Sequence, residues 1–287
     1  MVIQWYPGHM TKAKRAMLDD VKKVDLVIEL LDARIPFSSR NPDIDELARG
    51  KYRLILLNKA DLADEAVTAA WIRHFKESSL RAIALDARAK TARKQVETAI
   101  TDICREKIEK DRKRGISGRR IKAMVAGIPN VGKSTFINSL AGHAAAKTGN
   151  LPGVTRGNQW IRVGTSVDLL DTPGILWPKF EDETVGTNLA LVGSVNEEIT
   201  IPEELAAELI KSLRQISPGA VSRRYGAEEG EPFEVLKAAA IQRSCFKKQS
   251  EPDTERMAKQ LLNEFRSGKL GRISLEQPPV TDEAAHG

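Results

Sequence analysis

Short apolar blocks and segments of helical periodicity alternate along the chain up to about residue 180. The apolar blocks have strand length, and the segments between them repeat apolar residues every three or four positions. Alternating strands and helices with continuous apolar strands predict an α/β fold with a mainly parallel, doubly wound sheet. The expected strands are 25–32, 54–57, 82–85, 122–126, 159–163 and 167–170, and the expected helices are 11–23, 44–49, 65–77, 95–114 and 133–140.

The chain changes character after about residue 180, where strand patterns stop. Residues 203–213, 234–245 and 254–267 have helical periodicity and predict a small all-α C-terminal domain. The last residues combine proline with small and charged side chains, which favours disorder. We therefore expect an α/β domain over residues 1–178, a helical domain over 179–275 and a disordered tail over 276–287.

Composition is typical of a globular protein with a substantial core. Of the 287 residues, 41% are hydrophobic and 29% are charged. No run approaches the roughly 18 apolar residues that cross a bilayer, and the first residues lack a secretory signal. Two cysteines, Cys104 and Cys245, are too few for a disulfide framework or a cysteine zinc site. These features predict a cytoplasmic protein without a membrane partner.

Positive charge is concentrated in separate segments. The net charge is +6, and residues 104–122 alone contain nine Lys or Arg against three Asp or Glu. Residues 12–23 contain five Lys or Arg and two Asp. One basic run is most simply a solvated helix face, but several of them favour a polyanionic partner such as RNA.

Residues 127–134, GIPNVGKS, match the phosphate-binding pattern G-x-x-x-x-G-K-[ST]. The segment follows an expected strand and opens an expected helix, whose N-terminus favours anions. In such a loop Lys133 reaches the β- and γ-phosphates and Ser134 offers its hydroxyl to Mg²⁺. We expect a nucleotide-phosphate site here.

Residues 58–61, NKAD, end an expected strand and fit a guanine-reading loop. The carboxylate of Asp61 can accept two hydrogen bonds from N1–H and the 2-amino group of guanine, a donor pair that adenine lacks. Asn58 can bridge the phosphate loop and the purine, and the Lys59 stem can pack along the base. This tetrapeptide favours a GTPase over a P-loop ATPase or kinase.

Three further segments complete the predicted site. Asp171 begins the sequence DTPG at a strand end, where the Mg²⁺-side aspartate of this class lies. Thr155, in a polar loop, is the candidate switch threonine that joins Mg²⁺ when a γ-phosphate is present. Residues 86–88, DAR, are the candidate for the loop behind the base, although their pattern is weak. The predicted nucleotide-binding residues are Asn58, Lys59, Asp61, Asp86, Ala87, Asn130, Val131, Gly132, Lys133, Ser134, Thr135, Asp171 and Gly174, and the predicted Mg²⁺ ligands are Ser134, Thr155 and Asp171.

The guanine-reading tetrapeptide precedes the phosphate loop, which is a circularly permuted order for a P-loop GTPase. Four other segments accompany it: WYPGHM at 5–10, DARIP at 32–36, SRNP at 39–42 and EFRSGKLG at 264–271. Together they resemble the ribosome biogenesis GTPase A (RbgA/YlqF) family over about residues 3–275. The rotated order also places the Asp171–Gly174 switch segment directly before the helical domain. We expect a change at the γ-phosphate to be passed along this short stretch of chain to the helical domain.

The resemblance implies a GTPase of late assembly of the large (50S) ribosomal subunit, with GTP, GDP and Mg²⁺ as ligands. It implies ribosomal RNA and ribosomal proteins as partners, and stimulation by the large subunit. It also implies K⁺ activation through Asn130, whose plainer interpretation is a turn residue. We expect the chain to act as a monomer. The helical domain would bind RNA, with Arg223, Arg224, Lys247 and Lys248 as candidate contacts.

The residue that activates water is the least determined part of the predicted site. Many GTPases use a glutamine after the switch glycine, but Gly174 is followed by Ile175 and Leu176. The resemblance implies His9 instead, since a neutral imidazole accepts a hydrogen bond from water near neutral pH. The alternative is a surface histidine without a role. The predicted catalytic residues are His9, Lys133 and Thr155.

Two other functions are compatible with these motifs. One is a nucleotide-gated RNA-binding scaffold in which hydrolysis is incidental. The other is a permuted GTPase of small-subunit assembly, although the sequence lacks the N-terminal OB-fold or zinc module usual in such proteins.

Overall fold

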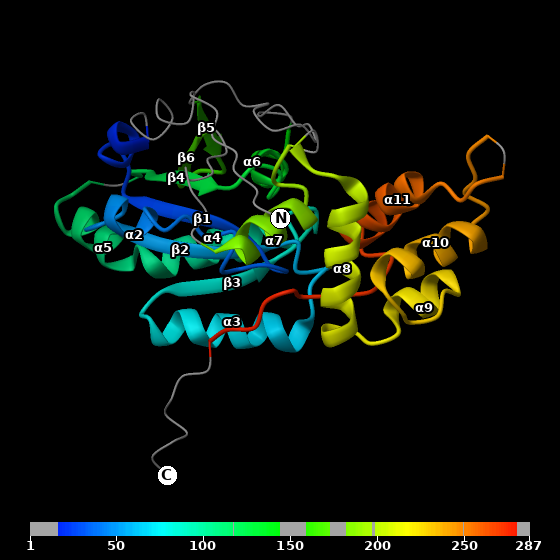
Figure 1. The fold of residues 1–287 in the computed structure, drawn as a ribbon. Coiled ribbons are helices and arrows are strands. Elements are labelled where there is room, and N and C mark those ends of the chain that lie inside the picture. Colours follow the sequence, from blue (N-terminus) through cyan, green and yellow to red (C-terminus); the bar gives the residue numbers. More distant parts are fainter. Residues whose placement is uncertain are drawn as a thin grey trace, which may run out of the picture.

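A computed structural model of the chain describes residues 17–116, 118–143, 159–172, 182–196, 199–248 and 250–279. Three predicted functional residues, His9, Thr155 and Gly174, lie outside this part of the chain. Figure 1 shows a sheet flanked by helices, with a group of C-terminal helices beside it.

Six strands form a single sheet in the order β3-β2-β1-β4-β6-β5. Every neighbouring pair is parallel except β5 and β6, which are antiparallel. All residues of the central strand β1 are buried, as expected for a sheet covered on both faces. The predicted mainly parallel α/β sheet is confirmed. The strands are β1 (Leu26–Asp32), β2 (Tyr52–Asn58), β3 (Arg81–Leu85), β4 (Ile121–Gly127), β5 (Gln159–Val163) and β6 (Val167–Asp171).

The register of the sheet brings the predicted motifs to one edge. Asp32 at the end of β1 pairs with Asn58 at the end of β2. Gly127, which ends β4, pairs with Leu30 of β1, and Asp171 pairs with Val125 of β4. Because these strands are parallel, their carboxyl ends and the loops that follow lie together.

The helices expected over 44–49, 65–77 and 133–140 are present, and residues 11–16 of the helix expected over 11–23 lie outside the described part of the chain. The single helix expected over 95–114 is two helices that meet at Cys104. Before Cys104 the chain packs on the sheet, whereas after it only Asp111 is buried. Burial raises the pKa of the Cys104 thiol to about 12, so this thiol is unreactive. These helices are α2 (Ile44–Leu47), α3 (Glu65–Glu77), α4 (Ala92–Ile103), α5 (Arg105–Lys113) and α6 (Lys133–Ala141).

The C-terminal region contains two helices that the sequence pattern did not predict, α7 and α9. Glycine, threonine and asparagine give α7 low helix propensity, but its buried face includes Val185 and Leu189. The six residues of α9 lie between Gly219 and Gly226, both in the left-handed conformation. The helices are α7 (Glu183–Leu191), α8 (Pro202–Ile216), α9 (Ala220–Tyr225), α10 (Pro232–Gln242) and α11 (Thr254–Arg266).

One hydrophobic core runs from the sheet into the C-terminal helices. Leu30 and Val125 of the sheet belong to the same cluster as Leu189 of α7 and Phe265 of α11. In Figure 1, α8 stands between the sheet and helices α9, α10 and α11. The helical region is thus continuous with the α/β core rather than separated from it by a solvated interface.

The chain returns to the α/β domain after α11, as the red segment in Figure 1 shows. The N–H of Ile273 donates to Leu62 O (3.0 Å), and the N–H of Leu275 donates to Arg34 O (2.8 Å). The Glu276 carboxylate accepts from the N–H groups of Phe37 (2.7 Å) and Ser38 (3.1 Å). Disorder was predicted from residue 276, and this is wrong for 276–279, because Glu276 is anchored in the α/β domain. Residues 280–287 lie outside the described part of the chain.

A buried carboxylate on α11 gives the helical region a predictable acid sensitivity. Glu264 accepts hydrogen bonds from Arg224 Nε (2.6 Å), Tyr225 Oη (2.9 Å) and Gln260 Nε2 (3.0 Å). The bond from Arg224 is the main cause that lowers the pKa of Glu264 from 4.5 to about 2.

The folded state therefore holds Glu264 ionised at a pH where the unfolded chain protonates it. Its stabilisation is complete above pH 4.5 and is lost as the pH falls toward 2. We expect Glu264→Gln to lower the Tm at pH 7 and to have progressively less effect below pH 4.5, measured by thermal unfolding across this range. A Tm difference that does not change with pH would contradict this assignment.

Candidate nucleotide-binding site

The phosphate loop is shaped by two glycines that no other residue could replace without rearrangement. A Cβ on Gly127 would lie 2.6 Å from Leu30 O, and a Cβ on Gly132 would lie 2.6 Å from Asn58 Nδ2. Gly132 also has a φ of +100°, which disfavours side chains. The loop thus packs directly against β1 and the guanine-reading loop, and α6 begins at its end.

Lys133 lies in the first turn of α6 and folds back over its own loop. Its Nζ donates to Gly127 O (3.1 Å) and Ile128 O (3.2 Å). Burial lowers the pKa of Lys133 to about 8, while the charge of Asp171 opposes this shift. A buried ammonium that donates to two carbonyls of its own loop is a suitable partner for phosphate oxygens.

Asp171 ends β6 beside the phosphate loop and fits the position of a Mg²⁺-side carboxylate. Burial raises its pKa, and Lys133 partly offsets this shift. Among the described residues, Asp171 Oδ1 is buried without a hydrogen-bond partner. The strand end is fixed by Thr172, whose Oγ1 donates to Val125 O (2.7 Å). Oxygen donors from a carboxylate and from the hydroxyl of Ser134 are the ligands that Mg²⁺ prefers.

Asn58 joins the three loops of the site. Its Nδ2 donates to Val131 O in the phosphate loop (2.8 Å), and its Oδ1 accepts from the N–H of Ala87 (3.1 Å). The predicted loop at 86–88 is thereby placed next to residues 58–61. Asn58 is buried, so both bonds are shielded from water.

Lys59 links the guanine-reading loop to both neighbouring strand ends. Its backbone has a φ of 59°, an uncommon conformation for a residue with a side chain. Its Nζ donates to Asn130 O (2.8 Å) and forms an ion pair with Asp32 Oδ2 (3.1 Å). The stem of Lys59 is therefore stretched across the site between the phosphate loop and β1.

Asp61 is paired on one side and unsatisfied on the other. Its Oδ2 accepts from Arg88 Nη2 (2.6 Å), and Asp86 Oδ1 accepts from the N–H of Arg88 (2.9 Å). In the described structure Asp61 Oδ1 is buried and has no hydrogen-bond partner. The orphaned Oδ1 is free to accept one of the two guanine donors. The contact between Arg88 and Asp61 was not predicted, because the two residues meet only when β2 and β3 are paired.

Asn130 contacts the helical region rather than the loop alone. Its φ is 57°, and its Nδ2 donates to Gly193 O, just after α7, at 2.7 Å. No sequence signal connects these two residues. The structure thus brings together the described members of the predicted site around the carboxyl edge of the sheet, and His9, Thr155 and Gly174 lie outside the described residues.

Comparison with known proteins shows which family this chain belongs to. The model of a family described as "50S ribosome-binding GTPase" matches residues 122–216. The ribosome biogenesis GTPase A of Bacillus cereus is 45% identical over 280 residues, which is 97% of this chain and 95% of that protein. The chain belongs to the ribosome biogenesis GTPase A family. It is accordingly a GTPase, with GTP and GDP as its nucleotides and Mg²⁺ as the usual metal of such domains.

More distant relatives support the same family. The ribosome biogenesis GTPase A of Thermotoga maritima is 34% identical over 99% of this chain and all of that protein. The mouse mitochondrial ribosome-associated GTPase 1 is 35% identical over 96% of this chain and 90% of that protein. The crystal structure of GNP-bound YlqF from Thermotoga maritima has a TM-score of 0.69 at 30% identity, and covers 94% of this chain and all of that one. The predicted permuted GTPase fold is confirmed.

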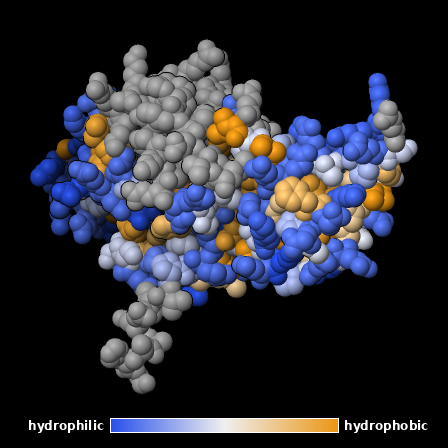
Figure 2. Space-filling model, in the orientation of Figure 1, coloured by the Kyte–Doolittle hydropathy of each residue, from blue (hydrophilic) through white to orange (hydrophobic). Residues whose placement is uncertain are grey.

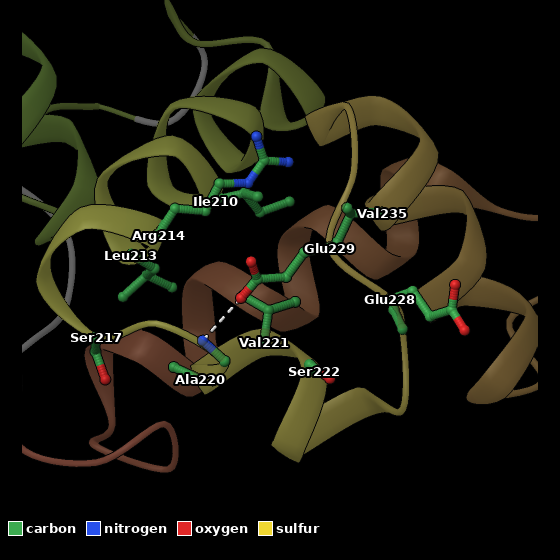
Figure 3. A pocket seen from close by; sticks show the side chains of 12 residues that line it. Ile210, Leu213, Arg214, Ser217, Ala220, Val221, Ser222, Glu228, Glu229 and Val235 are labelled. Carbon is green, nitrogen blue, oxygen red and sulfur yellow. Dashed lines mark hydrogen bonds between the residues drawn. The ribbon is translucent and has the colours of Figure 1, made fainter.

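A second concave site lies among α8, α9 and α10, away from the family's nucleotide loops. Figure 3 shows Arg214 and Glu229 at its walls, with the N–H of Gly219 donating to Glu229 Oε1 at 3.0 Å. Within the described residues, Arg214 Nη2 is buried without a hydrogen-bond partner. The cavity volume is about 20 Å³, which suits one water molecule and excludes a nucleotide. It therefore does not compete with the loops at the sheet edge.

Proposed function

We propose that this protein binds and hydrolyses GTP during late assembly of the large (50S) ribosomal subunit and docks there in a nucleotide-dependent manner. The observation that carries the proposal is the junction at Asn58, which ties the guanine-reading loop to the phosphate loop. Full-length similarity to proteins named for ribosome biogenesis supplies the biological context. The cytoplasmic location expected from the sequence is part of this proposal.

Each described site residue has a proposed role. Asp61 reads guanine with both carboxylate oxygens, Asn58 fixes the loops, and the Lys59 stem lies along the base. Lys133 binds the β- and γ-phosphates, aided by backbone N–H groups of the loop and α6 N-terminus. Ser134 and Asp171 hold Mg²⁺, which would neutralise phosphate charge when bound. The remaining proposed nucleotide contacts are Asp86, Ala87, Asn130, Val131, Gly132, Thr135 and Gly174, and Thr155 is the proposed third ligand of Mg²⁺.

We include His9 in the proposal as the residue that orients the attacking water. The support is the absence of a polar side chain directly after Gly174 in the sequence. His9→Ala should lower subunit-stimulated GTP turnover while GTP affinity stays the same. Full turnover by this variant would remove His9 from the mechanism.

We also propose that K⁺ raises activity through the phosphate-loop residue Asn130. Its Nδ2 is held by Gly193 O, and this bond fixes the orientation of the amide. Replacing KCl by NaCl at constant ionic strength should lower kcat, and Asn130→Ala should remove the difference between the salts. Equal rates of the wild-type protein in K⁺ and Na⁺ would contradict the proposal.

The segment that follows α10 offers a candidate RNA-binding surface. Phe246 is exposed there, and Lys247 and Lys248 next to it are exposed as well, while Phe233 is exposed in the first turn of α10. Figure 2 shows hydrophobic surface interrupting the hydrophilic surface at this end of the molecule. Aromatic faces and lysines together suit stacking on bases and pairing with phosphates. We propose this surface as the ribosomal RNA contact.

The other two predicted RNA contacts have partners within the protein. Arg224 pairs with Glu264 (2.6 Å), and Arg223 Nη1 donates to Pro218 O (2.9 Å). Lys247 and Lys248 are therefore the stronger candidates.

Co-sedimentation with purified ribosomal subunits tests the proposed function. With a non-hydrolysable GTP analogue the protein should migrate with the large subunit, and with GDP it should remain near the top of the gradient. Adding large subunits should also raise the rate of GTP hydrolysis. Binding to the small subunit alone, or nucleotide-dependent binding without any stimulated turnover, would favour the two other functions described above. Membrane contact forms no part of the proposal, and none of the helices within the described ranges is both long and apolar enough to cross a bilayer.

A further inference from the structure

We infer that Arg34 and Arg266 are positioning residues for the guanine-nucleotide site, through which the seating of α11 sets the affinity for GDP and GTP alike. The inference rests on the proposed nucleotide site and adds to it a route of control from the helical region. Neither side chain is expected to touch the nucleotide. Both act through residues that do.

The route starts at Lys59, the central side chain of the guanine-reading loop. Its Nζ is held by Asp32 Oδ2 (3.1 Å) and by Asn130 O of the phosphate loop (2.8 Å). Both the guanine-reading loop and the phosphate loop therefore depend on where the Asp32 carboxylate lies.

Asp32 is in turn fixed by Arg34. Arg34 donates to the Asp32 carboxylate from its backbone N–H (3.1 Å), Nε (2.8 Å) and Nη2 (2.7 Å). The Asp32 and Arg34 side chains are each 1% exposed. A buried, bidentate pair of this kind has a defined geometry, and loss of one partner leaves an uncompensated buried charge.

The other side of Arg34 faces α11. Its guanidinium carbon lies 5.4 Å from the centroid of the Phe265 ring, and its Nη1 is 3.4 Å from Arg266 O. The last turn of α11 thus packs directly against the guanidinium that holds Asp32. A shift of this turn would displace Arg34 and, through Asp32, Lys59.

Arg266 provides a second connection from the same turn. Its Nε donates to Leu191 O (2.9 Å) and its Nη2 donates to Ala190 O (2.9 Å), at the carboxyl end of α7. Two residues later Gly193 O accepts from Asn130 Nδ2 (2.7 Å). A Cβ on Gly193 would lie 3.3 Å from Arg266 Nε, so the two segments are in close contact. Arg266 is therefore connected to the Asn130 side chain through the end of α7, whereas Lys59 binds the Asn130 carbonyl.

The contacts of Arg34 and of Arg266 thus connect the last turn of α11 to the guanine-reading loop through Lys59 and to the phosphate loop through Asn130. Among the described residues, these contacts reach the guanine-reading loop and the phosphate loop. Both loops bind parts of the nucleotide that GDP and GTP have in common. A change in these contacts should alter both affinities by the same factor. The motif order predicts a different coupling, in which the helical region is connected to the site through the segment Asp171–Gly174. That coupling would act at the γ-phosphate and would change the ratio of the GDP and GTP affinities.

The test is nucleotide affinity and kinetics of Arg266→Gln in the full chain, using fluorescent GDP and a fluorescent non-hydrolysable GTP analogue. We expect both Kd values to rise by the same factor, about fivefold to tenfold, mainly through faster release. The KM for GTP should rise in parallel while kcat at saturation stays near the wild-type value. Arg266→Lys, which keeps the charge but has one donor nitrogen in place of the two that bind Leu191 O and Ala190 O, should restore part of the affinity.

Arg256→Gln is the matched control, because Arg256 is an exposed arginine in the first turn of the same helix. It should bind both nucleotides like the wild-type protein. Arg34→Lys provides a second test with smaller risk to folding than removal of the charge, and it should weaken both nucleotides equally. Circular dichroism and Tm establish that each variant is folded before its affinity is compared.

Three outcomes would overturn the inference: wild-type affinities in folded Arg266→Gln and Arg34→Lys, a loss confined to the GTP analogue, or an equal loss in Arg256→Gln. Failure of the proposed nucleotide site would be distinguishable, because the wild-type protein itself would then bind neither nucleotide.

Discussion

Replacing Asp61 by asparagine is expected to weaken GTP binding by about a hundredfold or more and to allow xanthosine triphosphate to bind instead. The carboxylate accepts two donors from guanine, and charge-assisted hydrogen bonds contribute roughly 1.5–3 kcal/mol each. Asparagine keeps a neutral acceptor for one guanine donor and turns its NH₂ group toward the other. The combined cost is about 3 kcal/mol, which corresponds to about a hundredfold in Kd. An amide presents one donor and one acceptor, a pattern that suits the xanthine edge. Equilibrium titration with both nucleotides measures the exchange.

Within the described structure Asp61 Oδ1 is buried and has no hydrogen-bond partner, so it is available to accept from guanine. Asp45→Asn is a suitable control, because Asp45 is an exposed carboxylate that pairs with Arg40 and Arg53 far from the loops. It should leave both affinities unchanged. If Asp61→Asn bound GTP as tightly as the wild-type protein, guanine would have to be read elsewhere.

Replacing Lys133 by alanine is expected to lower kcat/KM for GTP by about a thousandfold. A buried ammonium aimed at transferring phosphate oxygens contributes on the order of 3–4 kcal/mol to transition-state stabilisation. Removal also leaves Gly127 O and Ile128 O without the donor they now share. Phosphate release under single-turnover conditions measures the loss, and Lys122→Ala, an exposed lysine on the same β4 strand, is the control. Hydrolysis near the wild-type rate would show that the phosphates bind at another loop.

The strands and the long helices of the α/β region could be predicted because their signals are local. The mostly apolar residues 26–31 and the apolar run 54–57 are long enough to mark buried strands by themselves, and α3 spans the predicted residues 65–77. The break at Cys104 and the short helices α7 and α9 depend on tertiary packing. A periodic pattern continues through Cys104, whereas α7 has poor propensity and is stabilised by burial.

The site was predictable to the extent that each motif carries its own backbone geometry. Gly127 and Gly132 shape the phosphate loop. Asn58 ends β2 and Asp61 follows three residues later, so a parallel sheet brings them close to that loop. Contacts between distant segments were not predictable. The Arg88–Asp61 pair, the Asn130–Gly193 bond and the packing of Arg34 on Phe265 each join residues that no pattern relates.

These long-range contacts add a second connection to the one that the permuted motif order predicts. The order predicts that a conformational change at the γ-phosphate is passed to the helical region through residues 171–174. Residues 173–181 lie outside the described part of the chain, so that route stays a prediction. The described structure adds contacts on the guanine side, where the segment after α11 packs against Arg34 and residues 60–63. Arg272 alone donates to Ala63 O (2.8 Å) and Ala60 O (3.1 Å). The helical region therefore supports the base-reading loop directly.

A crystal structure of the protein with GDP and Mg²⁺ tests most directly whether the permuted motifs form one guanine-nucleotide site. The account predicts that guanine N1–H and the 2-amino group donate to the Asp61 carboxylate, with Lys133 Nζ on the β-phosphate and Asn58 between the two loops. Density for the base away from Asp61, or for the phosphates away from the loop at residues 127–134, would contradict it.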